Sequence, residues 1–281
     1  MKKSLQGLRL IFFMSLLILM ISPAPVWGEE MLQTSLIMAG SGSNLPIIRV
    51  LAQAFMKKHP DIAIEVPTSI GSTSGIRAVA DNAIAIGLIS RSLKKHEKEL
   101  GLEVVIYAHT PLIIGVHPGV TEENITYAGI IDIYRGMKNR WKDGKEIIVL
   151  TREPGDSTIE VMTKEVPGFK EVYDESQRAK RWTTLFKDLE MDETLAKTPD
   201  AIGFTDLCSL TIERHRIKAL KVKNVAPTLK NLENNTYPLV KPLAFVFHRE
   251  KLPTAARDFL AFVHSREGAK ILRDNGCLPK E

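Results

Sequence analysis

Cysteine is scarce in this sequence, aromatic side chains are few, and long apolar runs are absent beyond the N-terminal segment. Only two of the 281 residues are cysteine, Cys208 and Cys277, so a scaffold held together by several disulfides is excluded. A single bridge between them stays open, because the sequence does not place their Cα atoms. After residue 21, no apolar run approaches the roughly 18 residues of a membrane-spanning helix. With 44% hydrophobic and 25% charged residues, a disordered chain is excluded as well.

Motifs for metal, cofactor and nucleotide binding are also missing. The seven histidines form no HExxH motif and no close pair on one helical face, and the sequence has no CxxC. It has no GxxxxGK[ST] phosphate loop and no complete GxGxxG. The stretch GSTSG at 71–75 resembles the nucleophile turn of a hydrolase, but its central residue is Thr73 and no histidine stands out as a base. We therefore expect no metal, no cofactor and no enzymatic activity.

The excess of positive charge belongs mostly to the N-terminus. The chain has 38 basic and 33 acidic residues, and three of the basic ones lie in segment 1–28, which has no acidic residue. An apolar run over 10–21 follows, and Val26 and Gly28 fit positions −3 and −1 of a signal-peptidase site. We predict a cleavable signal peptide over 1–28 and a periplasmic protein; the alternative, an uncleaved anchor, has a run short of the ~20 residues that span a bilayer. The other 253 residues carry a net charge of +2, so nucleic-acid binding is not expected.

Short apolar runs alternate with longer amphipathic stretches, a pattern typical of mostly parallel sheets flanked by helices. The pattern occurs twice, which predicts an α/β protein of two lobes. The last predicted helix is expected to return to the first lobe. Strands are predicted at 36–38, 62–66, 83–89, 147–150 and 201–204, and helices at 45–58, 75–81, 157–164, 177–189 and 255–272.

Two long extended stretches, 104–116 and 237–247, are predicted to cross between the lobes. The first contains Pro111 and the second contains two prolines, which argue against a regular central strand in either stretch. If the chain crosses between the lobes twice, one lobe is built from two separate segments of the chain and the other from the single segment between them. The predicted boundaries are 29–108 plus 241–281 for lobe I and 109–240 for lobe II.

Four connections rich in glycine and hydroxyl side chains follow predicted strands and lead into helices. A helix N-terminus offers unpaired N–H groups and the positive end of the dipole, a combination that binds oxyanions. An arginine at a strand end adds a planar fork of donors. Helix capping explains any one of these connections, but four with so few carboxylates favour an anion site. They lie at 40–46, 71–75, 90–92 and 152–158.

Individual residues in these connections keep alternative explanations. Ser157 and Glu160 have the spacing of a capping box. Arg152 is the main candidate for binding an anion, and its alternative is a salt bridge to Glu153 or Glu160. Whether Arg91 points into the cleft stays open.

Eight segments carry a family pattern: GSGSNLP (40–46), IGSTSGI (70–76), IGLISRSL (86–93), IDIYRGMKNRW (131–141), REPGDST (152–158), TPDAIGF (198–204), YPLVKPL (237–243) and FVHSREG (262–268). In this order they resemble the phosphate-type substrate-binding proteins of ABC transporters, which belong to the periplasmic binding protein class. The resemblance covers essentially all of the chain after the signal peptide. It implies a two-lobe periplasmic binding protein fold with two crossover segments, a monomeric receptor that closes over phosphate or a similar oxyanion, and a permease in the inner membrane as its partner.

The resemblance also implies a ligand site with residues from both lobes. Two positions depart from the family. Phosphate receptors often carry an Asp where this chain has Ser90, and GDST replaces Gly-Ser-Gly-Thr at 155–158. The implied residues are Ser43, Asn44, Ser72, Thr73 and Ser90 from lobe I, and Arg152, Asp156, Ser157 and Thr158 from lobe II.

The carboxylate of Asp156 has two readings. It accepts the proton of the ligand and thereby selects phosphate or arsenate over fully ionised sulfate, or it turns away to cap its own helix and the pocket serves another ligand. The alternative functions are a receptor for another oxyanion or small anionic solute, with a sensor kinase as partner, and a phosphoester hydrolase that uses Ser or Thr. The missing base and metal ligands argue against the hydrolase.

Overall fold

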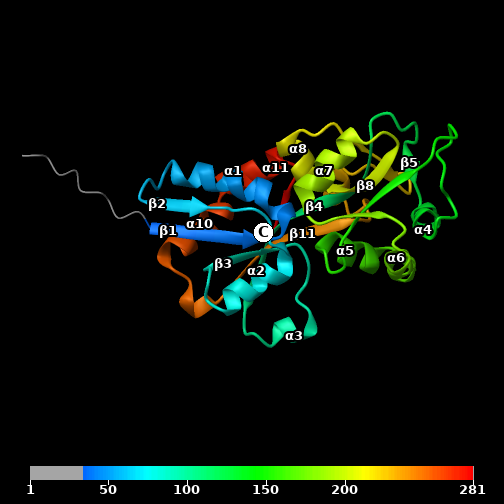
Figure 1. Ribbon diagram of the computed structural model, residues 1–281. Helices are drawn as coiled ribbons and strands as arrows, with labels where there is room; N and C mark the ends of the chain where they lie inside the picture. Colours follow the sequence, from blue (N-terminus) through cyan, green and yellow to red (C-terminus); the bar gives the residue numbers. More distant parts are fainter. Residues whose placement is uncertain (1–33, 281) are drawn as a thin grey trace, which may run out of the picture. The chain divides into compact units, whose positions relative to one another are not determined.

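The computed structural model of the chain describes residues 34–280, and Figure 1 shows the order of its elements. The signal peptide predicted over 1–28 lies outside these residues. Within them, no helix is both long and apolar enough to cross a bilayer. Ten strands of the described residues form one extended sheet, in which β2-β1-β3-β11-β4-β8-β6-β7 lie in this order and β9 and β12 pair with β4, while β5 and β10 form a separate two-stranded sheet. The large sheet is mixed because its two middle strands, β11 and β4, run antiparallel to their outer neighbours.

In the first half of the sheet, β1 lies between β2 and β3 and pairs parallel with both. Helix α1 lies against it with an apolar stripe formed by Ile48, Leu51 and Phe55, which are fully buried. This i, i+3, i+7 spacing explains why the segment forms an amphipathic helix. The elements of this half are β1 (Thr34–Gly40), η1 (Gly42–Asn44), α1 (Leu45–Met56), β2 (Ile62–Glu65), α2 (Gly71–Ala80), β3 (Ile86–Ile89), α3 (Lys95–Lys98), η2 (Arg249–Lys251), α10 (Thr254–Val263), α11 (Arg266–Asp274) and β12 (Leu278–Pro279).

The second half repeats the arrangement, with β6 between β8 and β7 and parallel to both. Its helices bury Ile133, Met162 and Phe169 in a separate core. The elements are β5 (Asn124–Ile125), α4 (Tyr127–Arg135), β6 (Ile148–Arg152), α5 (Ser157–Glu165), α6 (Phe169–Arg178), β7 (Thr183–Leu185), α7 (Asp188–Lys197), β8 (Ala201–Asp206), α8 (Leu207–Glu213), β9 (Lys218–Ala219), β10 (Lys221–Val222) and α9 (Leu229–Glu233).

Two long strands, β4 (Glu103–Val116) and β11 (Val240–Phe247), pair antiparallel in the middle of the sheet and connect its halves (Figure 1). The prediction that prolines prevent regular strands here is wrong. Pro111 lies between the residues of β4 that pair with β12 and those that pair with β8, and Pro242 precedes the residues of β11 that pair with β3. Each proline therefore has a neighbouring strand on one side only, where a missing N–H is tolerated.

Two of the predicted helices are wrong. The stretch 177–189 contains the end of α6, the strand β7 and the start of α7, because Lys180 adopts a left-handed φ of 49° and β-branched threonines follow it. The stretch 255–272 is divided into α10 and α11, because the Ser265 hydroxyl accepts the Gly268 N–H and starts a new helix.

Two separate hydrophobic cores agree with a two-lobe fold. One segment departs from the predicted division: α8 follows β8 of the second half in sequence but packs against α1 of the first half, and its Cys208 belongs to the first core. The lobe boundaries at 108 and 240 stay predictions. Cys208 and Cys277 are both free thiols buried in that first core.

Candidate functional site

A pocket of about 470 Å³ lies where the carboxyl ends of strands from both halves meet. Parallel α/β sheets place ligands at this edge, because the following helices point their N-termini toward it. From the first half come Ser41 and Gly42 after β1, residues 69–74 at the start of α2, and Lys94. From the second half come residues 152–157 between β6 and α5 and residues 186–188 between β7 and α7.

Helix α2 begins at Gly71, so the predicted connection 71–75 is the first turn of a helix. Its early N–H groups have no partners within the helix. The Ser72 hydroxyl accepts the Ser90 N–H at 3.3 Å, and the Thr73 hydroxyl accepts Nη2 of Arg91 at 2.9 Å. A hydroxyl that accepts a bond from the protein still has its own proton to donate. Ser72 and Thr73 line the pocket with that proton available.

Asn44 and Ser90, two of the predicted ligand residues, lie beneath the pocket and do not line it. The Asn44 amide donates to Ser90 Oγ at 2.7 Å and to the Ile89 carbonyl at 3.2 Å. Its carbonyl oxygen accepts the Tyr107 hydroxyl at 2.7 Å. Both residues are fully buried, so they hold the end of β3 in place. A direct contact of either residue with a ligand stays a prediction.

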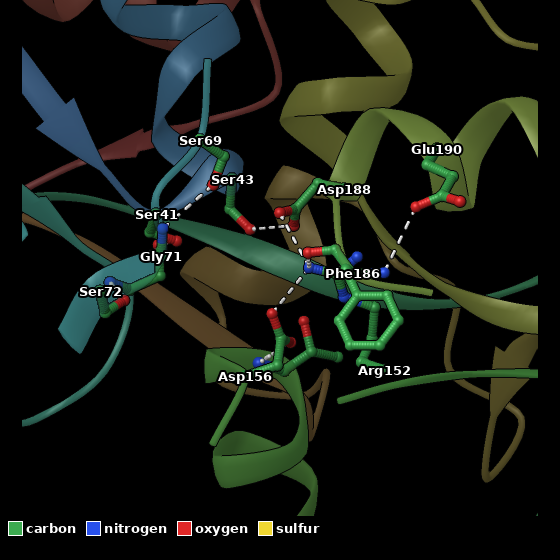
Figure 2. Close-up of polar contacts among 12 residues, drawn as sticks. Ser41, Ser43, Ser69, Gly71, Ser72, Arg152, Asp156, Phe186, Asp188 and Glu190 are labelled. Carbon is green, nitrogen blue, oxygen red and sulfur yellow. Dashed lines mark hydrogen bonds and ion pairs between the residues drawn. The ribbon is translucent and has the colours of Figure 1, made fainter. Parts of the chain in front are cut away.

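Arg152, at the end of β6, is the central cation of the site and is only 3% exposed. Its Nη2 donates to Asp156 at 2.9 Å, to the Phe186 carbonyl at 3.2 Å and to Asp188 at 3.3 Å (Figure 2). Its Nε and Nη1 are buried and have no partner among the described residues. Burial alone would lower the pKa of Arg152, but the carboxylates of Asp188 and Asp156 outweigh burial and raise it. The predicted alternatives, salt bridges to Glu153 or Glu160, are wrong.

Asp156 combines features of both readings. It is the N-cap of α5, where its Oδ1 accepts the Thr158 N–H at 2.9 Å, so the capping box predicted for Ser157 is wrong. It does not turn away, since it lines the pocket beside Arg152. Burial would raise the pKa of Asp156, but the charges of Arg152 and Lys241 lower it below its usual value, so the carboxyl is ionised.

The other predicted residues of the second half are divided between the pocket and the interior. Ser157 lines the pocket. Thr158 is 3% exposed and its hydroxyl accepts Nζ of Lys241, itself 1% exposed, at 2.7 Å. Ser43, from the first half, is buried and donates to Asp188 Oδ1 at 3.0 Å. The structure thus brings five of the nine predicted residues to the pocket wall and places Ser43, Asn44, Ser90 and Thr158 behind it.

Asp188 and Lys94 are pocket residues that the sequence reasoning missed. Asp188 is the first residue of α7, and the wrong helix over 177–189 hid the strand end that precedes it. In addition, the candidate connections were recognised by their hydroxyl side chains, and Asp188 carries a carboxylate instead. The signal that could have found it is the pair of β-branched residues Thr183 and Thr184 followed by apolar Leu185, which is typical of a short strand before a helix.

Arg91 does not line the pocket. Its guanidinium binds Glu97 through two bonds of 2.6 and 2.7 Å and is 4% exposed. Its Nε lies 3.4 Å from Glu160 of α5, and Lys94 Nζ lies 2.9 Å from the same oxygen. These two ion pairs connect the first half to the second at the edge of the pocket.

The pocket is suited to binding an oxyanion through an arginine, two hydroxyls and helix N-termini. Within residues 34–280, no group of three or more His, Cys, Asp or Glu side chains could hold a metal ion. The pocket wall contains no histidine.

Comparison with known proteins confirms the family resemblance. The sequence matches the PBP superfamily domain over residues 28–267. A phosphate-binding protein PstS of Bacillus subtilis is 27% identical over 261 residues, which cover 90% of this chain and 83% of the relative. A protein of the same name from Borreliella burgdorferi is 23% identical over 246 residues, covering 85% and 88%.

A solved structure from Clostridium perfringens agrees with this assignment. It is described as a putative phosphate ABC transporter substrate-binding protein with bound phosphate, and it matches with a TM-score of 0.80 at 27% identity. The match covers 88% of this chain and 100% of that one. Because the superfamily match spans most of the sequence and the two-lobe fold agrees with it, the chain belongs to the PBP superfamily.

Proposed function

We propose that this protein binds inorganic phosphate, or a close tetrahedral oxyanion, in the pocket between its halves and delivers it to the permease of an ABC transporter. The observation that carries the proposal is the state of Arg152, a residue of the pocket wall whose Nε and Nη1 are buried without a partner among the described residues. Buried guanidinium donors without acceptors are costly, and an oxyanion would satisfy both. The choice of phosphate as ligand and of an ABC transporter as partner rests on the names of the similar proteins.

The proposed protein is an exported monomer and not an enzyme. Its signal peptide and its division into lobes at 108 and 240 are part of the proposal. A phosphoester hydrolase would need a base positioned against its nucleophile, whereas the hydroxyls of Ser72 and Thr73 accept bonds from the Ser90 N–H and the Arg91 guanidinium and are bonded to no carboxylate or histidine among the described residues. Release of phosphate from a chromogenic phosphate ester by the purified protein would contradict the proposal.

The direct test is calorimetric titration of the purified protein with phosphate, arsenate, sulfate and molybdate. We expect phosphate and arsenate to bind and sulfate to bind at least about 100-fold more weakly. Arg152→Ala should reduce phosphate affinity by about 100-fold or more, because it removes a charged partner in a desolvated site. The matched control is Arg178→Ala, an exposed arginine at the end of α6. Wild-type affinity in Arg152→Ala would refute the site.

A further inference from the structure

The pocket contains more hydrogen-bond acceptors than a site for a fully ionised anion needs. Its donors include the Arg152 guanidinium, the hydroxyl protons of Ser72 and Thr73, and the N–H groups at the start of α2. Its acceptors are the carboxylates of Asp156 and Asp188, which lie on either side of the Arg152 guanidinium (Figure 2). A tetrahedral anion without protons could use the donors, but it would face both carboxylates with bare oxygens.

Asp188 is held in position by both halves of the molecule. Its Oδ1 accepts the Ser43 hydroxyl at 3.0 Å, and its Oδ2 accepts Nη2 of Arg152 at 3.3 Å. The carboxylate also lies against Gly42, where an added Cβ would meet Oδ2 at 2.1 Å, so the chain approaches Asp188 closely only because residue 42 is glycine. Each carboxylate oxygen accepts up to two hydrogen bonds, which leaves one position on each oxygen for a ligand proton.

The charges around the pocket also limit the charge of the ligand. The pocket wall has three cationic side chains, Lys94, Arg152 and Lys187, and three carboxylates, Glu153, Asp156 and Asp188. Their formal charges cancel, so the pocket provides no net charge to balance a dianion. Selectivity must then come from the direction of individual hydrogen bonds, and two carboxylate groups that face the ligand are matched by two ligand protons.

We propose that Asp188 accepts a second ligand proton beside Asp156, so that the pocket takes the tetrahedral oxyanion in its doubly protonated, singly charged form. This inference rests on the proposed function. For phosphate, the two O–H groups of dihydrogen phosphate donate to Asp156 and Asp188, and its two bare oxygens accept from Arg152 and from the hydroxyls of α2. Hydrogen phosphate, with one proton, leaves one carboxylate opposite a bare oxygen.

Several titratable groups surround the two carboxylates and must be separated from the ligand's own ionisation. Asp188 faces Arg152 and Asp156 from the β6 side, Asp192 from the next turn of α7 and Asp206 from β8. Burial raises the pKa of Asp192 to about 8, so this group ionises in the range in which phosphate loses its second proton. The groups that face Asp156 are Arg152, Glu153, Tyr173 on α6 and Lys241 on β11.

The test is the dissociation constant for total phosphate, measured by titration calorimetry at pH 6.0, 7.0, 8.0 and 8.5. The second ionisation of phosphate lies near neutrality, so a site for the monoanion should lose about tenfold in apparent affinity per pH unit above it. In Asp188→Asn the neutral amide no longer requires a second proton, and we expect the affinity to change less than about twofold over the same range. Asp188→Ser, measured in parallel, provides a smaller neutral side chain, and thermal melts verify that both variants fold.

Asp192→Asn is the matched control. It removes the neighbouring titration and leaves Asp188 intact, so the wild-type slope should persist. Two outcomes overturn the inference: a wild-type affinity that changes less than twofold between pH 6.0 and 8.5, or a wild-type slope in both Asp188 variants. A protein that binds no phosphate at any pH would instead refute the proposed function, so the two failures are distinguishable.

Discussion

Lys241 is a buried cation directly behind the site. Its Nζ donates to Thr158, and its charge joins that of Arg152 in lowering the pKa of the Asp156 carboxyl. Burial raises the pKa of Asp206, and the charge of Lys241 opposes this rise. We predict that Lys241→Met destabilises the protein by about 3 kcal/mol, because it removes a buried positive charge that interacts with the Asp156 and Asp206 carboxyl groups and with the Thr158 hydroxyl. Chemical denaturation measures this difference. Lys230→Met, which changes an exposed lysine of α9, should leave stability unchanged, and an equal effect in both variants would contradict the role of Lys241.

Asp192 makes stability depend on pH. Burial raises its pKa from 3.8 to about 8, so the folded protein keeps this proton up to about pH 8 while the unfolded chain loses it near pH 4. The folded state binds more protons between these values, and stability falls as the pH rises through that window. Asp192→Asn lacks this component. We therefore expect the melting temperature of the variant to exceed that of the wild type by more at pH 8 than at pH 5; a difference independent of pH would show that Asp192 is ionised when folded.

At the level of elements, α5 and the segment after β3 form one of the polar contacts between the halves. Glu160 of α5 lies between Arg91 and Lys94. We predict that Glu160→Gln weakens phosphate binding about fivefold, since ion pairs of this partly exposed kind contribute about 1 kcal/mol to the closed state. The radius of gyration from X-ray scattering should be larger for the ligand-free variant than for the wild type.

Glu165→Gln is the matched control for this prediction. Glu165 lies on the same helix and pairs only with its neighbour Lys164 among the described residues, so it does not connect the halves. Equal affinities of the Glu160 and Glu165 variants would show that the ion pairs contribute nothing to closure.

Strands and helix starts could be predicted where the residues of a short segment are enough to indicate its structure. The apolar runs that became β1, β3, β6 and β8 were found, because burial on both faces requires continuous apolar residues. The long strands β4 and β11 were located as extended stretches, but their regular pairing was not predicted, because a proline is tolerated only where no neighbouring strand needs its N–H. Only the sheet order supplies that information.

The site was predictable as a set of connections and not as a set of side chains. All four hydroxyl-rich connections contribute to the pocket or its floor, yet Asn44 and Ser90 point away from it while Ser72 and Thr73 face it. Adjacent hydroxyl residues have the same chemistry, and the direction of each is set by partners far away in the sequence. Asp188 could not be found at all without the strand β7, which has only three residues.

For the whole molecule, β4 contributes side chains to both cores, and β4 and β11 together join the two halves into one sheet. The side chains of Leu112 and Leu243, on these two strands, are fully buried in different cores. If either half unfolded, the apolar side chains of these two strands would become exposed to solvent and the core of the other half would be disrupted. We therefore predict a single cooperative unfolding transition in calorimetry, with equal van't Hoff and calorimetric enthalpies, and two separate transitions would contradict it.

Ligand binding should shift this one transition as a whole. A ligand that binds only the folded state adds about 2.7 kcal/mol at a concentration of 100 times its dissociation constant. Because both halves contribute to the pocket, phosphate should raise the midpoint of the single transition without splitting it. The Arg152→Ala variant, melted with and without phosphate, provides the control and should show almost no shift. If phosphate stabilised only part of the chain and a second transition appeared at the unliganded temperature, the pocket would belong to one half alone.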